Sequence, residues 1–135
     1  MQKKPHISIE ELIRRDGRYP LAAVQFVREG LNYTVSKVHP KAGEGERRHV
    51  TGEQLCLGLR EIALKKWGYM AKSVLNKWHI EQTRDFGEIV FIMVNSGWMH
   101  KEPTDSVDDF NEVYEFAYAL VKNFRMVEKE PDEEN

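Results

Sequence analysis

The sequence has little cysteine, no long apolar run and no large net charge, and each shortage narrows the class of protein. A single cysteine among 135 residues excludes an internal disulfide and suits a reducing compartment. The longest uninterrupted apolar run, Ile89–Val94, is far too short to cross a bilayer, and no apolar signal segment follows the first lysines. We therefore expect a cytoplasmic protein without a membrane segment.

The net charge of −2 hides an uneven distribution along the chain. Residues 1–46 carry a net charge of +2, residues 47–84 carry +5, and residues 85–135 carry −9. The small total gives no global basic field that would attract nucleic acid, so we regard a nucleic-acid partner as unlikely. The basic middle and the acidic end can neutralise each other within one fold or between two copies.

Apolar residues recur at helical spacing along most of the chain. A short helix is predicted over about 9–15, and longer ones over about 20–37, 52–67, 70–78, 84–95 and 107–126. Ser8 and Thr51 open sequences typical of a capping box, and Gly17 is expected to end the first helix. Thr83 is a candidate cap for the segment that Gly97 ends. We expect a mainly α-helical single domain of about five helices over residues 1–127, followed by a disordered acidic tail over 128–135.

The sequence does not decide the secondary structure of two segments. The apolar run within 88–94 suits a buried strand or a buried helix, and its cap and glycine stop favour the helix. Residues 98–114 could form a short β-hairpin, or Ser106 could cap the helix over 107–126. A helix-turn-helix or winged-helix-like core around Gly68 is a further variant, although Lys77 then falls on an inward position.

Three sets of residues are candidates for function. Aromatic side chains that a small domain cannot all bury could form a partner-binding surface, and these are Trp67, Tyr69, Trp78 and Trp98. Cationic side chains of the basic middle could form a patch for nucleic acid, and these are Arg47, Arg48, Lys65, Lys66, Lys72 and Lys77. Carboxylates that could hold Mg²⁺ for hydrolysis, as in all-α pyrophosphohydrolases, are Asp105, Asp108, Asp109 and Glu112, but no second pair matches them on another helix.

Other chemistry finds little support in the sequence. The five histidines show no metal-ligand spacing, and Gly43-Glu44-Gly45 lacks the Lys-Ser/Thr of a phosphate-binding loop. Cys56 lies between two leucines and is expected to be a small buried apolar residue. We expect no cofactor.

Four stretches together resemble a small uncharacterised family of bacterial conserved hypothetical proteins. They are Asp16–Pro20, Thr51–Arg60, Asp85–Phe91 and Asp105–Phe110. The resemblance covers most of residues 8–120 and implies a bacterial, intracellular, single-domain protein, with no established activity to carry over.

The sequence thus favours a non-enzymatic protein-interaction or regulatory module that binds a protein partner or a second copy of itself. A nucleic-acid-associated helical protein and a metal-dependent hydrolase are the alternatives. Two structural observations distinguish these three hypotheses: where the cations lie, and whether the carboxylates of residues 105–112 converge on one site.

Overall fold

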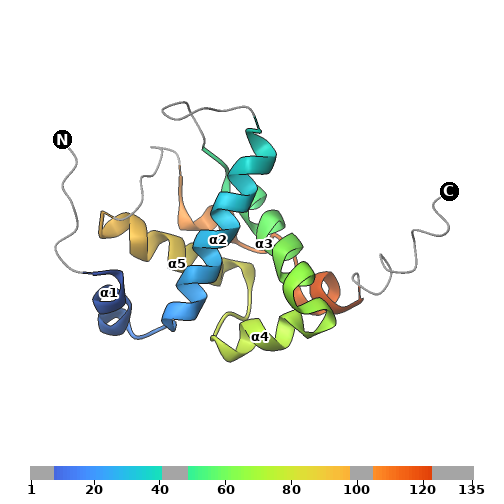
Figure 1. The fold of residues 1–135 in the computed structure, drawn as a ribbon, viewed down its shortest axis with the longest axis horizontal. Coiled ribbons are helices and arrows are strands. Elements are labelled where there is room, and N and C mark those ends of the chain that lie inside the picture. Colours follow the sequence, from blue (N-terminus) through green and yellow to red (C-terminus); the bar gives the residue numbers. More distant parts are fainter. Residues whose placement is uncertain (1–7, 41–48, 98–104, 123–135) are drawn as a thin grey trace, which may run out of the picture.

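Two long helices, α2 (Leu21–Val38) and α3 (Gly52–Trp67), pack side by side at the centre of the molecule (Figure 1). A computed structural model describes residues 8–40, 49–97 and 105–122 of the chain. The remaining helices are α1 (Ile9–Asp16), α4 (Ala71–Lys77) and α5 (Thr83–Asn95). Short helical segments complete the described part: η1 (Gly68–Met70) and η2 (Val107–Phe110) are 3-10 helices, and η3 (Tyr118–Lys122) is a π-helix.

The prediction of a mainly helical single domain is confirmed, because these helices enclose one core and the described residues contain no strand. Each of the helices α1 to α5 contributes to this core, which includes Leu59 of α3, Leu75 of α4 and Phe86 and Ile89 of α5, each no more than 1% exposed. None of the described helices is both long and apolar enough to span a membrane.

The contact between α2 and α3 explains a glycine in the middle of α2. A Cβ on Gly30 would collide with the Leu59 side chain, and a Cβ on Gly58 would collide with the Thr34 side chain. The Thr34 hydroxyl donates to the Gly30 carbonyl at 2.7 Å, so it forms its own hydrogen bond inside this contact. Two glycines, one on each helix, therefore let the backbones approach closely, and this contact offsets their low helix propensity.

The predicted ends of the early helices are largely confirmed. The Ser8 hydroxyl accepts from the Glu11 amide, and Thr51 and Gln54 form the reciprocal capping box at the start of α3. Gly17 ends α1 with a φ of 77°. These local signals work because each satisfies helix-end groups without help from distant residues.

The ambiguous segment within 88–94 belongs to α5, and Gly97 follows this helix with a φ of 85°, as predicted. The predicted cap at Thr83 is wrong. Thr83 is the first residue of α5 and is completely buried, and its hydroxyl donates to the Phe110 carbonyl at 2.6 Å. At the same end, the Asp85 carboxylate accepts from the amides of Glu81 and Gln82.

The predicted continuous helix over 107–126 is also wrong, and the β-hairpin near 98–114 is not supported. Residues 105–114 contain η2 and no strand, and residues 98–104 lie outside the described part, as does the tail over 128–135. The Thr83 hydroxyl donates to the Phe110 carbonyl and accepts from the Val113 amide, groups that a continuing helix would use. Glu112 has a φ of 46°, so the helix stops before a second short segment, η3, begins.

Candidate interaction surface

Large apolar side chains are exposed where η1 and η3 meet. Tyr69 and Met70 of η1 are 64% and 50% exposed, and Tyr118 of η3 is 52% exposed. The two segments lie against each other at the lower end of α3 (Figure 1). We call Tyr69, Met70 and Tyr118 the η1–η3 surface, and apolar exposure of this kind is typical of a site that binds another molecule.

The backbone of η3 is held in place from α3. The Arg60 guanidinium donates to the Ala119 carbonyl at 3.0 Å. Leu57, one turn before Arg60 on α3, is a further exposed apolar side chain, at 46%. The η1–η3 surface therefore stands on packed helices rather than on an isolated loop.

Of the four aromatic residues predicted to bind a partner, Tyr69 is the one that the structure exposes. Trp67 and Trp78 are partly buried and pack on Phe26, with ring centroids 5.2 and 6.0 Å from it and 5.6 Å from each other. Trp98 lies outside the described residues. The two described tryptophans thus belong mainly to the core, and Tyr69 belongs to the surface beside them.

The described lysines of the predicted basic patch divide into two groups. On α3, Lys66 pairs with Glu29 at 3.2 Å, and the Lys65 ammonium lies 5.1 Å from the centre of the Tyr33 ring. Lys72 and Lys77 lie on α4, while Arg47 and Arg48 fall outside the described residues. Because Lys65 and Lys66 face α2, Lys72 and Lys77 are the members of this set that add positive charge along α4.

The predicted metal ligands do not converge on one point within the described ranges. Asp108 pairs with Arg84 at 2.9 Å, Asp105 lies 3.4 Å from His49 Nε2, and Asp109 accepts from the Ser106 amide. Glu112 is exposed. No group of three potential ligands close enough to hold a metal ion occurs among residues 8–40, 49–97 and 105–122.

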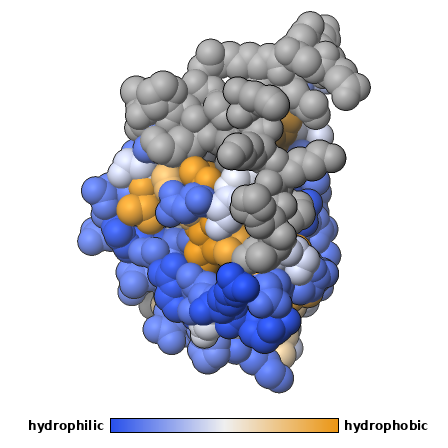
Figure 2. Space-filling model, turned by 90° about the vertical axis from the view of Figure 1, so that its left-hand side faces the viewer, coloured by the Kyte–Doolittle hydropathy of each residue, from blue (hydrophilic) through white to orange (hydrophobic). Residues whose placement is uncertain are grey.

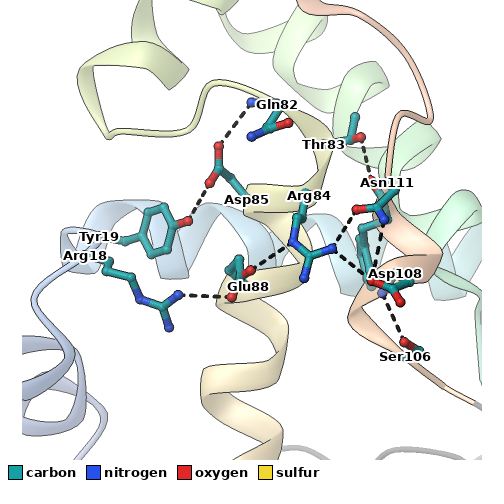
Figure 3. Close-up of polar contacts among 11 residues, drawn as sticks. Arg18, Tyr19, Gln82, Thr83, Arg84, Asp85, Glu88, Ser106, Asp108 and Asn111 are labelled. Carbon is teal, nitrogen blue, oxygen red and sulfur yellow. Dashed lines mark hydrogen bonds and ion pairs between the residues drawn. The ribbon is translucent and has the colours of Figure 1, made fainter.

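An extended network of polar side chains joins α1, α5 and η2, and the sequence reasoning missed it (Figure 3). Arg18, just after α1, contacts Asp16 at 2.9 Å and Glu88 at 3.0 Å. Arg84 donates to Glu88 at 3.1 Å and to Asp108 at 2.9 Å. The Arg18 guanidinium lowers the pKa of the Asp16 carboxyl by hydrogen bonding, despite partial burial that opposes this effect.

Tyr19 extends this network toward the core. Its hydroxyl donates to the Asp85 carboxylate at 2.6 Å, which links the chain after α1 to the start of α5. Burial raises the pKa of the Tyr19 phenol, and the hydrogen bond to Asp85 adds to this effect. The network contains residues from three of the stretches that carried the family resemblance, but no spacing rule pairs residues so far apart in sequence. Each of its two arginines contacts two carboxylates and so joins neighbouring segments, and we assign the network a structural role.

A cavity of about 160 Å³ lies between α2, α3, α5 and η2. Its walls include Val35, Leu55, Val94 and Phe110. The polar side chains His49, Asp105 and Asp109 also line it. Figure 2 views the end of the molecule where α5 finishes and shows apolar side chains among hydrophilic ones. A volume of this size corresponds to a single benzene-sized group.

Cys56 is fully buried in α3, as predicted. Burial raises the pKa of its thiol to about 12, so the thiol stays protonated at neutral pH. A nucleophilic role would need an accessible thiolate, and this side chain offers none.

No protein-family model, curated protein or solved structure matches this chain. The η1–η3 surface is consequently assessed from its own exposure and charge.

Proposed function

We propose that this chain is a non-enzymatic protein-interaction module that binds its partner through the η1–η3 surface. The observation that carries the proposal is the exposure of Tyr69, Met70 and Tyr118 on two adjoining segments. Tyrosine is enriched among the residues that dominate binding energy, because it combines a large apolar ring with a polar hydroxyl. Methionine adds an adaptable apolar contact.

The charge around this surface indicates the chemistry of the partner. Lys65 and Lys66 face α2, whereas Lys72 and Lys77 of α4 add positive charge next to η1, so an acidic segment is attracted there. Lys72 and Lys77 lie at opposite ends of α4, which follows η1 directly. The partner that fits is a peptide segment with apolar side chains flanked by acidic ones.

Binding of nucleic acid is the second candidate, and the same lysines are the observation that favours it. Exposed Tyr69 could stack on a base while lysines contact phosphates. However, Lys66 already pairs with Glu29, and Lys65 lies over the Tyr33 ring, so two of the four described lysines face α2. We favour the protein partner for this reason. A cytoplasmic location is part of the proposal, because the only cysteine is a buried free thiol.

The decisive test is selection of peptides from a randomised display library on the immobilised full chain. We expect the selected peptides to combine acidic and apolar residues, and we expect Tyr69→Ala to weaken their binding by more than about tenfold. Val38→Ala is the matched control, because Val38 is 36% exposed but lies at the far end of α2.

Three results would contradict this proposal. The first is a library that yields no binder, and the second is binding that Tyr69→Ala leaves unchanged. The third is a single-stranded oligonucleotide that binds more tightly than any selected peptide, which would instead support the nucleic-acid candidate. Light scattering at low and high salt, on a size-exclusion column, would show whether a second copy is itself the partner.

A further inference from the structure

The cavity between α2, α3, α5 and η2 has one wall that is fixed by close packing. Phe110 of η2 is 5% exposed, and its carbonyl accepts from the buried Thr83 hydroxyl at 2.6 Å. A Cβ on Gly52 would lie 3.0 Å from the Phe110 ring, and a Cβ on Gly87 would lie 2.7 Å from it. Because both glycines leave room for this ring, Phe110 is held between α3 and α5, and the void beside it stays open.

The void has the size of one small aromatic ring. Its volume is about 160 Å³. Apolar side chains reach it from three helices, and these include Leu31, Val35, Leu55, Val90 and Val94. Apolar voids of this size take up benzene-sized molecules in other proteins, because an unfilled void deprives its lining of dispersion contacts. A ring that entered this cavity would restore those contacts.

Three ionisable side chains give the cavity a polar region. His49 Nε2 lies 3.4 Å from Asp105 Oδ1, and Asp109 Oδ2 accepts from the Ser106 amide at 3.0 Å. Oδ1 of Asp109 makes no hydrogen bond to the part of the chain that the structure describes. This oxygen can therefore accept from a bound molecule while the other oxygen keeps its contact with Ser106.

The charge of this polar region is negative. Two carboxylates accompany one imidazole there, and the described residues that line the cavity include no lysine or arginine. The start of α3 at Gly52 contributes roughly half a positive charge, which two carboxylates exceed. The cavity thus combines apolar walls with a region that attracts a cation.

We propose that this cavity binds a small organic amine, whose benzene-sized group fills the void and whose protonated amino group contacts Asp105 and Asp109. The site lies at the N-terminal end of α3, whereas η1 follows the C-terminal end of the same helix. The sixteen residues of α3 span about 24 Å. This inference goes beyond the proposed function and does not depend on it, because the two sites lie at opposite ends of α3.

Titration of the ¹⁵N-labelled full chain with benzylamine, followed through its amide resonances, tests the site directly. We expect saturable shifts that are largest at Val50, Gly52 and Leu55, which line the cavity. Benzyl alcohol has nearly the same shape without the charge, and it should bind at least about fivefold more weakly, as expected for a partly exposed ionic contact. Benzoate should bind more weakly still, because its charge has the same sign as the two carboxylates.

Two kinds of variant separate the charge of the site from its shape. Asp105→Asn combined with Asp109→Asn keeps acceptor oxygens but removes both charges, so it should abolish the preference for benzylamine and leave the affinity for benzyl alcohol unchanged. Val94→Phe places a ring in the void and should prevent binding of both probes, and Val35→Phe fills it from α2 should the first variant fail to fold. Val38→Phe is the matched control, because Val38 is exposed on α2.

Four results would overturn the proposal. They are shifts that do not saturate, equal affinity for benzylamine and benzyl alcohol, tighter binding of benzoate, and binding that survives both cavity-filling variants. Tyr69→Ala should leave benzylamine binding unchanged, because Tyr69 lies beyond the other end of α3. Intact benzylamine binding together with an empty peptide selection would overturn the proposed function alone.

Discussion

At the scale of single residues, Thr83 joins the start of α5 to the segment after η2. Its hydroxyl is fully buried, donates to the Phe110 carbonyl and accepts from the Val113 amide at 3.1 Å. One side chain therefore satisfies two backbone groups on a segment about thirty positions away. This pairing fixes the point at which the chain after η2 leaves helical geometry.

Thr83→Val should destabilise the fold by about 1–3 kcal/mol. Valine has nearly the same shape but leaves the Phe110 carbonyl and the Val113 amide without their partner in the interior. Urea denaturation followed by tryptophan fluorescence measures the free energy of unfolding. Ser73→Ala is the control, because Ser73 is exposed on α4. A loss below about 0.5 kcal/mol for Thr83→Val would show that the two backbone groups find other partners.

At the scale of elements, the approach of α2 to α3 depends on small residues at the contact. Alanine has the higher helix propensity by about 1 kcal/mol, so Gly58→Ala would stabilise an exposed helix. Here the added Cβ meets the Thr34 side chain, whose Cβ is only 3.1 Å away. We expect a net destabilisation of about 1–3 kcal/mol instead, because the helices must separate or Thr34 must give up its hydrogen bond to Gly30.

The same denaturation measurement checks the effect of Gly58→Ala. Thr34→Ala combined with Gly58→Ala should recover part of the loss, because the smaller side chain makes room for the new methyl group. An increase in stability from Gly58→Ala alone would contradict the close contact between the two helices.

At the scale of the whole molecule, acid should weaken the fold through carboxylates that are held ionised. The pKa of Asp16 is lowered by Arg18, and the pKa of Glu61 is lowered by hydrogen bonds from the Tyr33 hydroxyl and the Lys37 ammonium. A carboxyl whose pKa is lower in the folded state stabilises the fold above its unfolded pKa. That contribution is lost as the pH falls through the folded pKa.

The free energy of unfolding should therefore decrease as the pH falls from about 5 toward 3, a window that begins near the ordinary pKa values of 3.8 for Asp16 and 4.5 for Glu61. Asp16→Asn combined with Glu61→Gln should lower stability at pH 7 and make this decrease smaller. Urea midpoints at several pH values measure both effects. Glu81→Gln, in the exposed turn before α5, is the control. An identical decrease in the double variant and the wild type would contradict this assignment.

The sequence by itself determined where most helices begin and end. The caps at Ser8 and Thr51 and the stops at Gly17 and Gly97 are local, since each depends on groups within about four residues. The position of Cys56 between two leucines also predicted its burial. These features could be predicted because their physical causes lie close together along the chain.

The tertiary structure decided the rest, because the causes there lie far apart in sequence. The break after η2 follows from Thr83 and from Phe110 packing on Gly87, positions that no local spacing connects. Tyr69 is exposed and Trp67 is partly buried, although both are aromatic and lie two positions apart in the sequence. Which of the two faces water depends on how α4 is oriented relative to α3. Pairing of Arg84 with Asp108, rather than convergence of carboxylates on a metal ion, likewise required two segments to meet. Hydrophobic periodicity assigns residues to helices, but only the packed arrangement of helices selects which side chains face water and which charges meet.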